Sequence, residues 1–300
     1  MNRYKEKHIQ QYQQENKNKA RFLIKCPDQP GIVRIVSDFL YKHGANIVAS
    51  DQHTIDPEGG QFFIRIEFEC ENLDQMKGKL EEDFKPIAEE FHMDWEISYV
   101  SNLKNMAIFV SKEPHCLLEL LWEYQSGDLM ADIKLVISNH ETTREIVEGM
   151  GIPFYYIPAN KDIRQEVEAK QKELLEQYEI ELIVLARYMQ ILTDDFVKDY
   201  ENQIINIHHS FLPAFVGAKP YERAFNRGVK MIGATSHYVT KNLDEGPIIE
   251  QDIERVTHRD NAEVMKKIGQ SIERNVLARA VSWHLEDKII VHENRTIVFK

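Results

Sequence analysis

The sequence predicts an α/β protein of two domains: a ferredoxin-like βαββαβ domain, then a Rossmann-like domain with a mostly parallel sheet. The chain has 300 residues, which fits two domains of ordinary size, and its apolar fraction of 43% can supply two cores. Over residues 20–101 short strands alternate with two helices, whereas from residue 102 onward single strands are separated by longer helices.

The first domain follows a polar segment and has a clear signal for each element. Residues 1–19 are rich in Gln, Asn and Lys, so we expect a flexible polar tail or a loose helix. Strand 21–25 leads into the turn Asp28–Gly31, which opens a helix that ends at Gly44, a left-handed cap. The remaining expected elements are paired strands over 47–53 and 61–68, an amphipathic helix over 73–90 and a strand over 93–100.

The turn and the helix end of this domain carry a resemblance. Asp28 to Ile32, followed by Gly44 to Ile47, resembles an ACT domain, a regulatory module that often binds amino acids. The resemblance implies a regulatory domain over 20–101 with an effector site at Asp28, Gly31 and Asn46, where main-chain donors at a helix start could hold a carboxylate. The alternative is an empty turn that serves only an assembly contact.

The second domain spans residues 102–300, and its first residues, 102–105, form a short polar hinge. We expect strands over 106–110, 133–137, 154–157, 180–185, 203–207, 230–238 and 247–256. We expect helices over 116–122, 142–150, 163–178 and 261–284, and a final hairpin of strands 288–291 and 296–299.

Composition excludes several classes of partner. The net charge of −12 argues against a general nucleic-acid or membrane-surface binder, and no apolar run is long enough to span a bilayer. Cys26, Cys70 and Cys116 lie far apart, so we expect a reduced, cytoplasmic protein without disulfides. The histidines form no metal-binding pattern, and we predict neither a metal nor a cofactor.

Polar residues gather where two expected strands end. One strand ends in Asn206 and His208, and a strand that includes His237 leads into a turn that contains Asp244. Ligands bind at this edge of open α/β sheets, so an amide, an imidazole and a carboxylate are expected to converge there. Such groups can hydrogen-bond an oxyanion, move a proton and align a water, which suits attack on a carbonyl without a covalent nucleophile. The alternative is that they only cap a strand and form a turn.

The order of these residues resembles the folate-dependent formyltransferase family. The resemblance rests on Asn206-Ile207-His208, Ser210, Leu212-Pro213, His237, Asp244 and Gly246. With His209 and Phe211 inside the motif, the chain is most similar to the formyltetrahydrofolate deformylase branch. The resemblance implies a catalytic trio of Asn206, His208 and Asp244, with His237 supporting Asp244.

One departure from the family concerns the loop 111–114. Formyltransferases that bind ribonucleotides carry a Gly-rich phosphate loop at this place, whereas here the loop has no glycine and includes Glu113. Main-chain amides cannot easily wrap a phosphate in such a loop, and a carboxylate repels it. Water as the acceptor fits this departure, although another loop could bind an acceptor.

The segment after strand 180–185 is the expected substrate pocket. In the resembling family it walls the pterin pocket, which implies substrate contacts from Arg187, Met189, Gln190, Ile191 and Leu192, together with Thr240. The alternative is an ordinary core at a strand–helix junction.

The resemblance thus implies hydrolysis of 10-formyl-tetrahydrofolate to formate and tetrahydrofolate. The expected partners are the folate substrate, an amino-acid effector and other copies of the chain in a homo-oligomer, with no nucleic acid and no membrane. The alternatives are a formyltransferase with an amine acceptor, and a folate or amino-acid sensor without turnover.

Overall fold

The structure, a computed structural model, describes residues 2–56, 59–160, 162–213 and 220–300. The chain forms two compact units. The small unit contains Glu6–Leu103, Glu286–His292 and Ile297–Lys300, and the large unit contains Lys104–Leu285, Glu293–Thr296 and the first residues.

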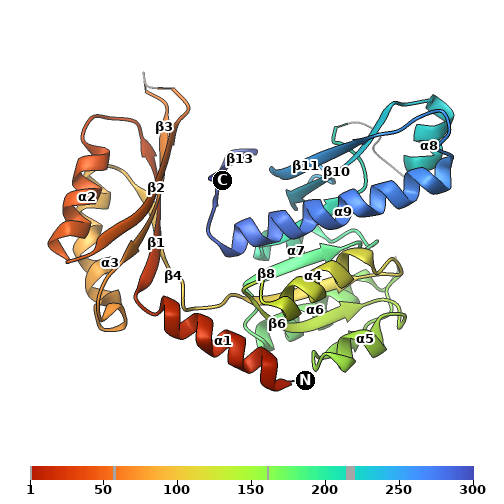
Figure 1. The fold of residues 1–300 in the computed structure, drawn as a ribbon, viewed down its shortest axis with the longest axis horizontal. Helices are drawn as coiled ribbons and strands as arrows, with labels where there is room; N and C mark the ends of the chain where they lie inside the picture. Colours follow the sequence, from red (N-terminus) through yellow and green to blue (C-terminus); the bar gives the residue numbers. More distant parts are fainter. Residues whose placement is uncertain (1, 57–58, 161, 214–219) are drawn as a thin grey trace. The chain divides into compact units, whose positions relative to one another are not determined.

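The small unit is the predicted ferredoxin-like domain. Its elements are β1 (Lys19–Pro27), α2 (Ile32–Lys42), β2 (Asn46–Thr54), β3 (Gln61–Glu69), α3 (Leu73–Glu90) and β4 (Asp94–Tyr99). The strands form an antiparallel sheet of order β2-β3-β1-β4, and both helices cover one face of it (Figure 1). The core between them is aromatic, with the rings of Phe22 and Phe84 packed edge to face at 4.5 Å. The polar start of the chain forms α1 (Asn2–Asn16), in keeping with its helix-forming Gln, Glu and Lys residues.

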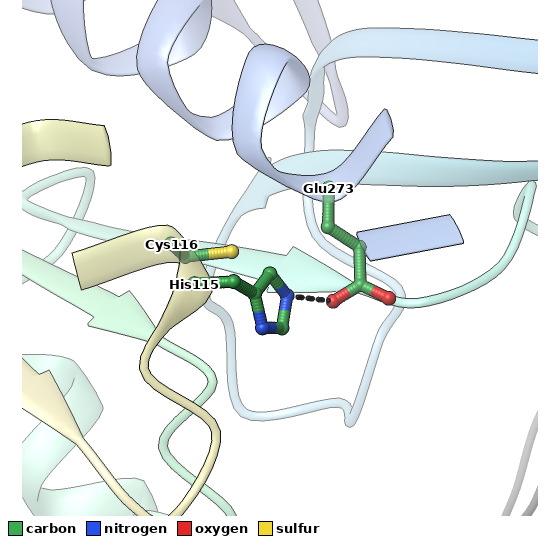
Figure 2. Close-up of side chains that lie close together, drawn as sticks. All are labelled: His115, Cys116 and Glu273. Atoms are coloured by element: carbon green, nitrogen blue, oxygen red, sulfur yellow. Dashed lines mark hydrogen bonds and ion pairs between the residues drawn. The ribbon is translucent and has the colours of Figure 1, made fainter. Parts of the chain in front are cut away.

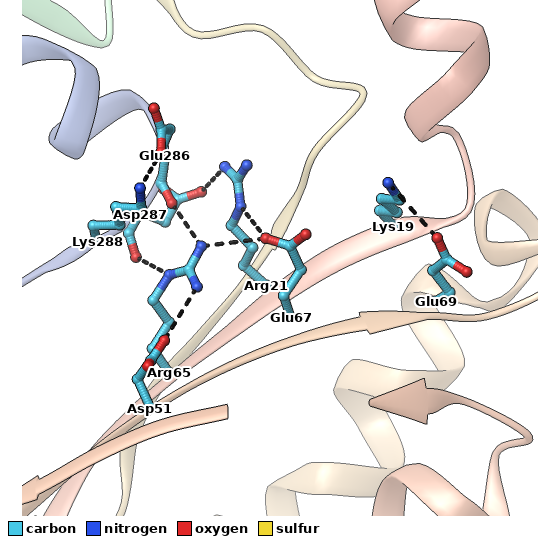
Figure 3. A network of polar contacts seen from close by, with 9 residues as sticks. All are labelled: Lys19, Arg21, Asp51, Arg65, Glu67, Glu69, Glu286, Asp287 and Lys288. Atoms are coloured by element: carbon cyan, nitrogen blue, oxygen red, sulfur yellow. Dashed lines mark hydrogen bonds and ion pairs between the residues drawn. The ribbon is translucent and has the colours of Figure 1, made fainter. Parts of the chain in front are cut away.

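Two arginines lie on the sheet face opposite these helices and bind the segment that follows the last helix of the large unit (Figure 3). Arg21 forms an ion pair with Asp287 at 3.2 Å, and Arg65 donates hydrogen bonds to the main-chain oxygens of Glu286 and Asp287. Glu67 accepts from both arginines. Because buried guanidinium groups need partners, this network holds Glu286 and Asp287 against the sheet.

The large unit is the predicted Rossmann-like domain. Its elements are β5 (Asn105–Val110), α4 (His115–Ser126), β6 (Asp132–Ser138), α5 (Arg144–Gly149), β7 (Phe154–Tyr156), α6 (Arg164–Gln177), β8 (Leu182–Ala186), α7 (Asp194–Asp199), β9 (Ile204–His208), α8 (Pro220–Arg227), β10 (Met231–Tyr238), β11 (Ile248–Arg255) and α9 (Ala262–Leu285). At the end of the chain β12 (Ile289–His292) pairs with β13 (Arg295–Val298), as predicted.

The sheet of the large unit has the order β11-β10-β9-β8-β5-β6-β7. Strands β5 to β9 are parallel, while β10 and β11 run antiparallel at one side, which confirms a mostly parallel sheet. The strand order reverses between β5 and β8, so the carboxyl edge beside them is the expected place for a ligand. Within the described residues, no helix is apolar enough over a sufficient length to cross a membrane.

Candidate active site

Strands β9 and β10 bring the first polar residues of the site together. Residues on one strand alternate between its faces, so Asn206 and His208 share a face, and His237 on β10 is paired directly with Asn206. The Nδ2 atom of Asn206 lies 3.2 Å from Nε2 of His237. Nδ1 of His237 donates to the main-chain oxygen of Tyr238 at 3.0 Å, so in a neutral ring Nε2 accepts the hydrogen bond from the amide.

Asp244 joins these groups from the turn after β10. Its Oδ2 atom lies 3.2 Å from Nδ1 of His208, and its Oδ1 atom lies 3.7 Å from Nε2 of His237. Burial alone would raise the pKa of Asp244, but the neighbouring His208 and His237 outweigh burial and hold the pKa well below its usual range. The carboxyl group is therefore ionised at neutral pH.

The backbone of this turn is tightly held. Asp244 has a left-handed conformation, with φ of 58°, which side chains rarely adopt. Gly246 lies so close to β10 that a Cβ atom there would be 1.8 Å from the main-chain oxygen of Tyr238. Only glycine fits this approach, and the close contact fixes the carboxylate relative to the strand.

His208 presents one ring nitrogen to a ligand. Its Nδ1 atom bonds to Asp244, while its Nε2 atom is buried and has no hydrogen-bond partner among the described residues. Because His208 lines a pocket, Nε2 is the ring atom available to a bound substrate.

The pocket beside the trio has a volume of about 380 Å³. It contains every predicted substrate-binding residue: Arg187, Met189, Gln190, Ile191, Leu192 and Thr240. The residues Met189, Ile191 and Leu243 are more than half exposed, at 58%, 53% and 59%. Exposed apolar side chains beside a concave site suit a flat aromatic ligand.

The wall of the pocket is anchored to the neighbouring strands. Ser111, just after β5, accepts a hydrogen bond from the main-chain nitrogen of Met189 at 3.0 Å and donates one to Asn139 at 2.7 Å. Arg187, like Asp244, has a left-handed backbone, with φ of 63°. Both residues therefore hold sparsely populated backbone conformations beside the same pocket.

The predicted effector residues do not come together within one chain. Asp28 and Gly31 lie at the start of α2, where Gly31 has φ of 99°, and Asp28 accepts a hydrogen bond from Thr54. Asn46 follows the other end of that helix, at the opposite end of the sheet. An 11-residue helix is about 16 Å long, so one small ligand cannot touch both ends in a single chain. The effector site stays a prediction.

A polar cluster beside this pocket was not predicted from the sequence. His115 and Cys116 on α4 meet Glu273 on α9 (Figure 2). Among the described residues this is the one group of three or more His, Cys, Asp or Glu residues whose possible metal-ligand atoms all lie within 4.8 Å of one another. The donor set does not fit a metal ion. Glu273 accepts from His115 at 2.8 Å and from Tyr221 at 2.5 Å, and Arg187 adds a positive charge 3.4 Å away.

The thiol of the cluster also argues against a metal, because burial raises the pKa of Cys116 well above its usual value and metals bind the thiolate. One sequence signal could have revealed Glu273: it is a charged residue at a core position of α9, next to buried Ile272 and close to buried Val276 and Leu277.

Comparisons with known proteins agree with this fold. Residues 104–281 match the Formyl transferase family and residues 20–84 match the ACT domain. The chain is 64% identical over 299 residues to the formyltetrahydrofolate deformylase of Bacillus subtilis strain 168, and the match covers 100% of both chains.

Solved structures give the same result. The chain is similar to a formyltetrahydrofolate deformylase from Pseudomonas syringae pv. tomato, with a TM-score of 0.89, 46% identity and 94% of each chain covered. It is also similar to a phosphoribosylglycinamide formyltransferase from Coxiella burnetii, with a TM-score of 0.61 and 29% identity, over 66% of this chain and 94% of that one.

Proposed function

This chain belongs to the formyltetrahydrofolate deformylase family, and we propose that its residues Asn206, His208 and Asp244 catalyse the hydrolysis of 10-formyl-tetrahydrofolate to formate and tetrahydrofolate. The observation that carries the assignment is the ion pair between His208 and Asp244, which leaves one histidine nitrogen available beside a pocket of about 380 Å³.

Each member of the trio has a separate task. Ionised Asp244 orients a water molecule toward the formyl carbon and, through Nδ1, stabilises a protonated His208. As water attacks, the carbonyl oxygen becomes negative, and Asn206 and Nε2 of His208 donate hydrogen bonds to it. His237 keeps the Asn206 amide in place.

The proton balance is complete without a covalent intermediate. The attacking water loses a proton through Asp244 as the carbon–oxygen bond forms. His208 gives a proton to the folate nitrogen as the carbon–nitrogen bond breaks. Asp244 returns its proton to His208, and the formic acid produced ionises to formate.

The loop after β5 supports water as the acceptor. Glu113 in this loop binds Lys266 at 2.7 Å and Gln270 at 3.0 Å, both on α9. The loop has no glycine and is held by its carboxylate, so it offers no cradle for the phosphate of a ribonucleotide amine.

The ACT match supports regulation by a small molecule. We propose that this molecule is an amino acid and that it binds to the small unit. The effector would bind near the start of α2, where Gly31 leaves main-chain N–H groups available to a carboxylate.

The test is incubation of the purified protein with 10-formyl-tetrahydrofolate alone, with formate as the readout. We expect formate without any added amine, and a changed rate when glycine or methionine is present. Formyl transfer that requires an added amine, with no formate in its absence, would contradict the hydrolase assignment.

A further inference from the structure

A buried carboxylate lies behind the catalytic histidine and has no part in the proposed chemistry. Glu273 on α9 has a side chain that is 1% exposed. Three donors surround it: Nε2 of His115, the hydroxyl of Tyr221 and the guanidinium of Arg187. Burial of a carboxylate is costly, and these contacts outweigh it, so the pKa of Glu273 is lowered and the group is ionised.

Arg187 connects this carboxylate to the active site. Its Nε atom pairs with Glu273, while its Nη1 atom forms a short hydrogen bond with Nδ1 of His209. A guanidinium can only donate, so Nδ1 of His209 accepts and its proton lies on Nε2. Burial, followed by the charges of Arg187 and His208, lowers the pKa of His209 to about 4, and the ring is neutral at physiological pH.

The neutral ring of His209 lies against the catalytic ring. The centroids of His208 and His209 are 5.1 Å apart and their planes differ by 14°, which is a stacked arrangement. A continuous series of contacts therefore leads from Glu273 through Arg187 and His209 to His208, and on to Asp244.

We propose that Glu273 is a positioning residue for the reaction: it fixes Arg187, which holds His209 against His208, and its charge offsets that of Arg187 so that His208 can carry a proton. This inference rests on the proposed role of His208. No step of the chemistry touches Glu273 itself, and the residue acts only through its neighbours.

The titratable and charged groups around the stacked rings and around Glu273 come from several elements. They are Asp244 and His237 from β10 and its turn, Arg187 from the end of β8, Glu273 from α9, His115 and Cys116 from α4, and Tyr221 from α8. The carboxylates of Asp244 and Glu273 balance Arg187 and a protonated His208. Without Glu273, Arg187 would be an uncompensated cation close to His208 and would disfavour its protonated form.

The test compares Glu273→Gln with Glu263→Gln, an exposed glutamate on the same helix. The Glu273→Gln protein should lose roughly tenfold in kcat with little change in KM, a part of what a general acid contributes. Its kcat should also begin to fall at a lower pH on the basic side, because protonated His208 is less stable. The Glu263→Gln protein should match the wild type.

Conservative variants separate positioning from simple packing. Glu273→Asp keeps the charge, so its pH profile should return toward that of the wild type. An unchanged pH profile in Glu273→Gln, or wild-type kcat, would overturn the proposal. If Glu273→Gln does not fold, as judged by circular dichroism, Tyr221→Phe decides in its place: a lower kcat at constant KM supports the proposal, and wild-type kinetics refute it.

A His208→Asn protein tests the proposed function of the trio separately from the positioning role of Glu273. If it is inactive while Glu273→Gln is normal, only the positioning role fails. If it keeps wild-type turnover, the proposed function of the trio fails as well.

Discussion

Asp244 is the residue on which the proposed chemistry depends most, since it holds both the water and the proton of His208. The Asp244→Asn protein should lose about 100-fold or more in kcat, the usual cost of removing a preorganised polar group. Formate release measures this effect. Glu245→Gln, an exposed neighbour in the same turn, is the matched control and should keep wild-type turnover. Equal activity of the two variants would remove Asp244 from the mechanism.

Ionisation of Asp244 also affects stability, and the sign follows from the lowered pKa. A carboxyl whose folded pKa lies below its unfolded value, about 3.9, stabilises the fold above that value. The contribution is lost as the pH falls further toward the folded value. Thermal unfolding of wild type and Asp244→Asn should therefore differ most near neutral pH and converge in strong acid, and a difference independent of pH would contradict the ion pair.

The turn between β10 and β11 positions this carboxylate through one close backbone contact. A Cβ atom at Gly246 would lie 1.8 Å from the main-chain oxygen of Tyr238, so Gly246→Ala must move the turn. We expect a loss of about 1–3 kcal/mol in the free energy of unfolding, together with lower kcat. Gly149→Ala, at an uncrowded helical position of ordinary φ, should be neutral or slightly stabilising. Similar effects from both changes would show that the turn is not constrained.

Long periodic elements were predictable because each has its own apolar pattern. The helix over 73–90 was predicted with the limits that α3 has, and every predicted strand of the large unit exists within a few residues. The short helices α7 and α8 were missed, although α5, which has six residues like α7, was predicted within the segment 142–150. The pairing of Glu273 with Arg187 was also missed, since no local pattern joins residues 86 positions apart.

In the molecule as a whole, the small unit combines segments that lie far apart in the sequence. Arg21 on β1 pairs with Asp287, 266 residues later in the sequence, and Arg65 binds the main chain of the same segment (Figure 3). Composition and periodicity cannot predict that the chain comes back to the sheet of the small unit after α9, because this contact depends on where α9 ends. The small unit is therefore completed only after the catalytic sheet has been synthesised.

This arrangement predicts that the end of the chain stabilises the small unit. Asp287→Asn removes the charge that Arg21 binds, but leaves Glu67 as a partner, so we expect a loss of about 1–3 kcal/mol in the free energy of unfolding. Denaturant unfolding measures it. Glu293→Gln breaks an exposed pair with Arg295 at 3.7 Å and should change stability by less than about 1 kcal/mol. Equal stability of the two variants would mean that the ion pair between Arg21 and Asp287 contributes nothing measurable, because Asp287 differs from Glu293 mainly in its burial and its buried partner.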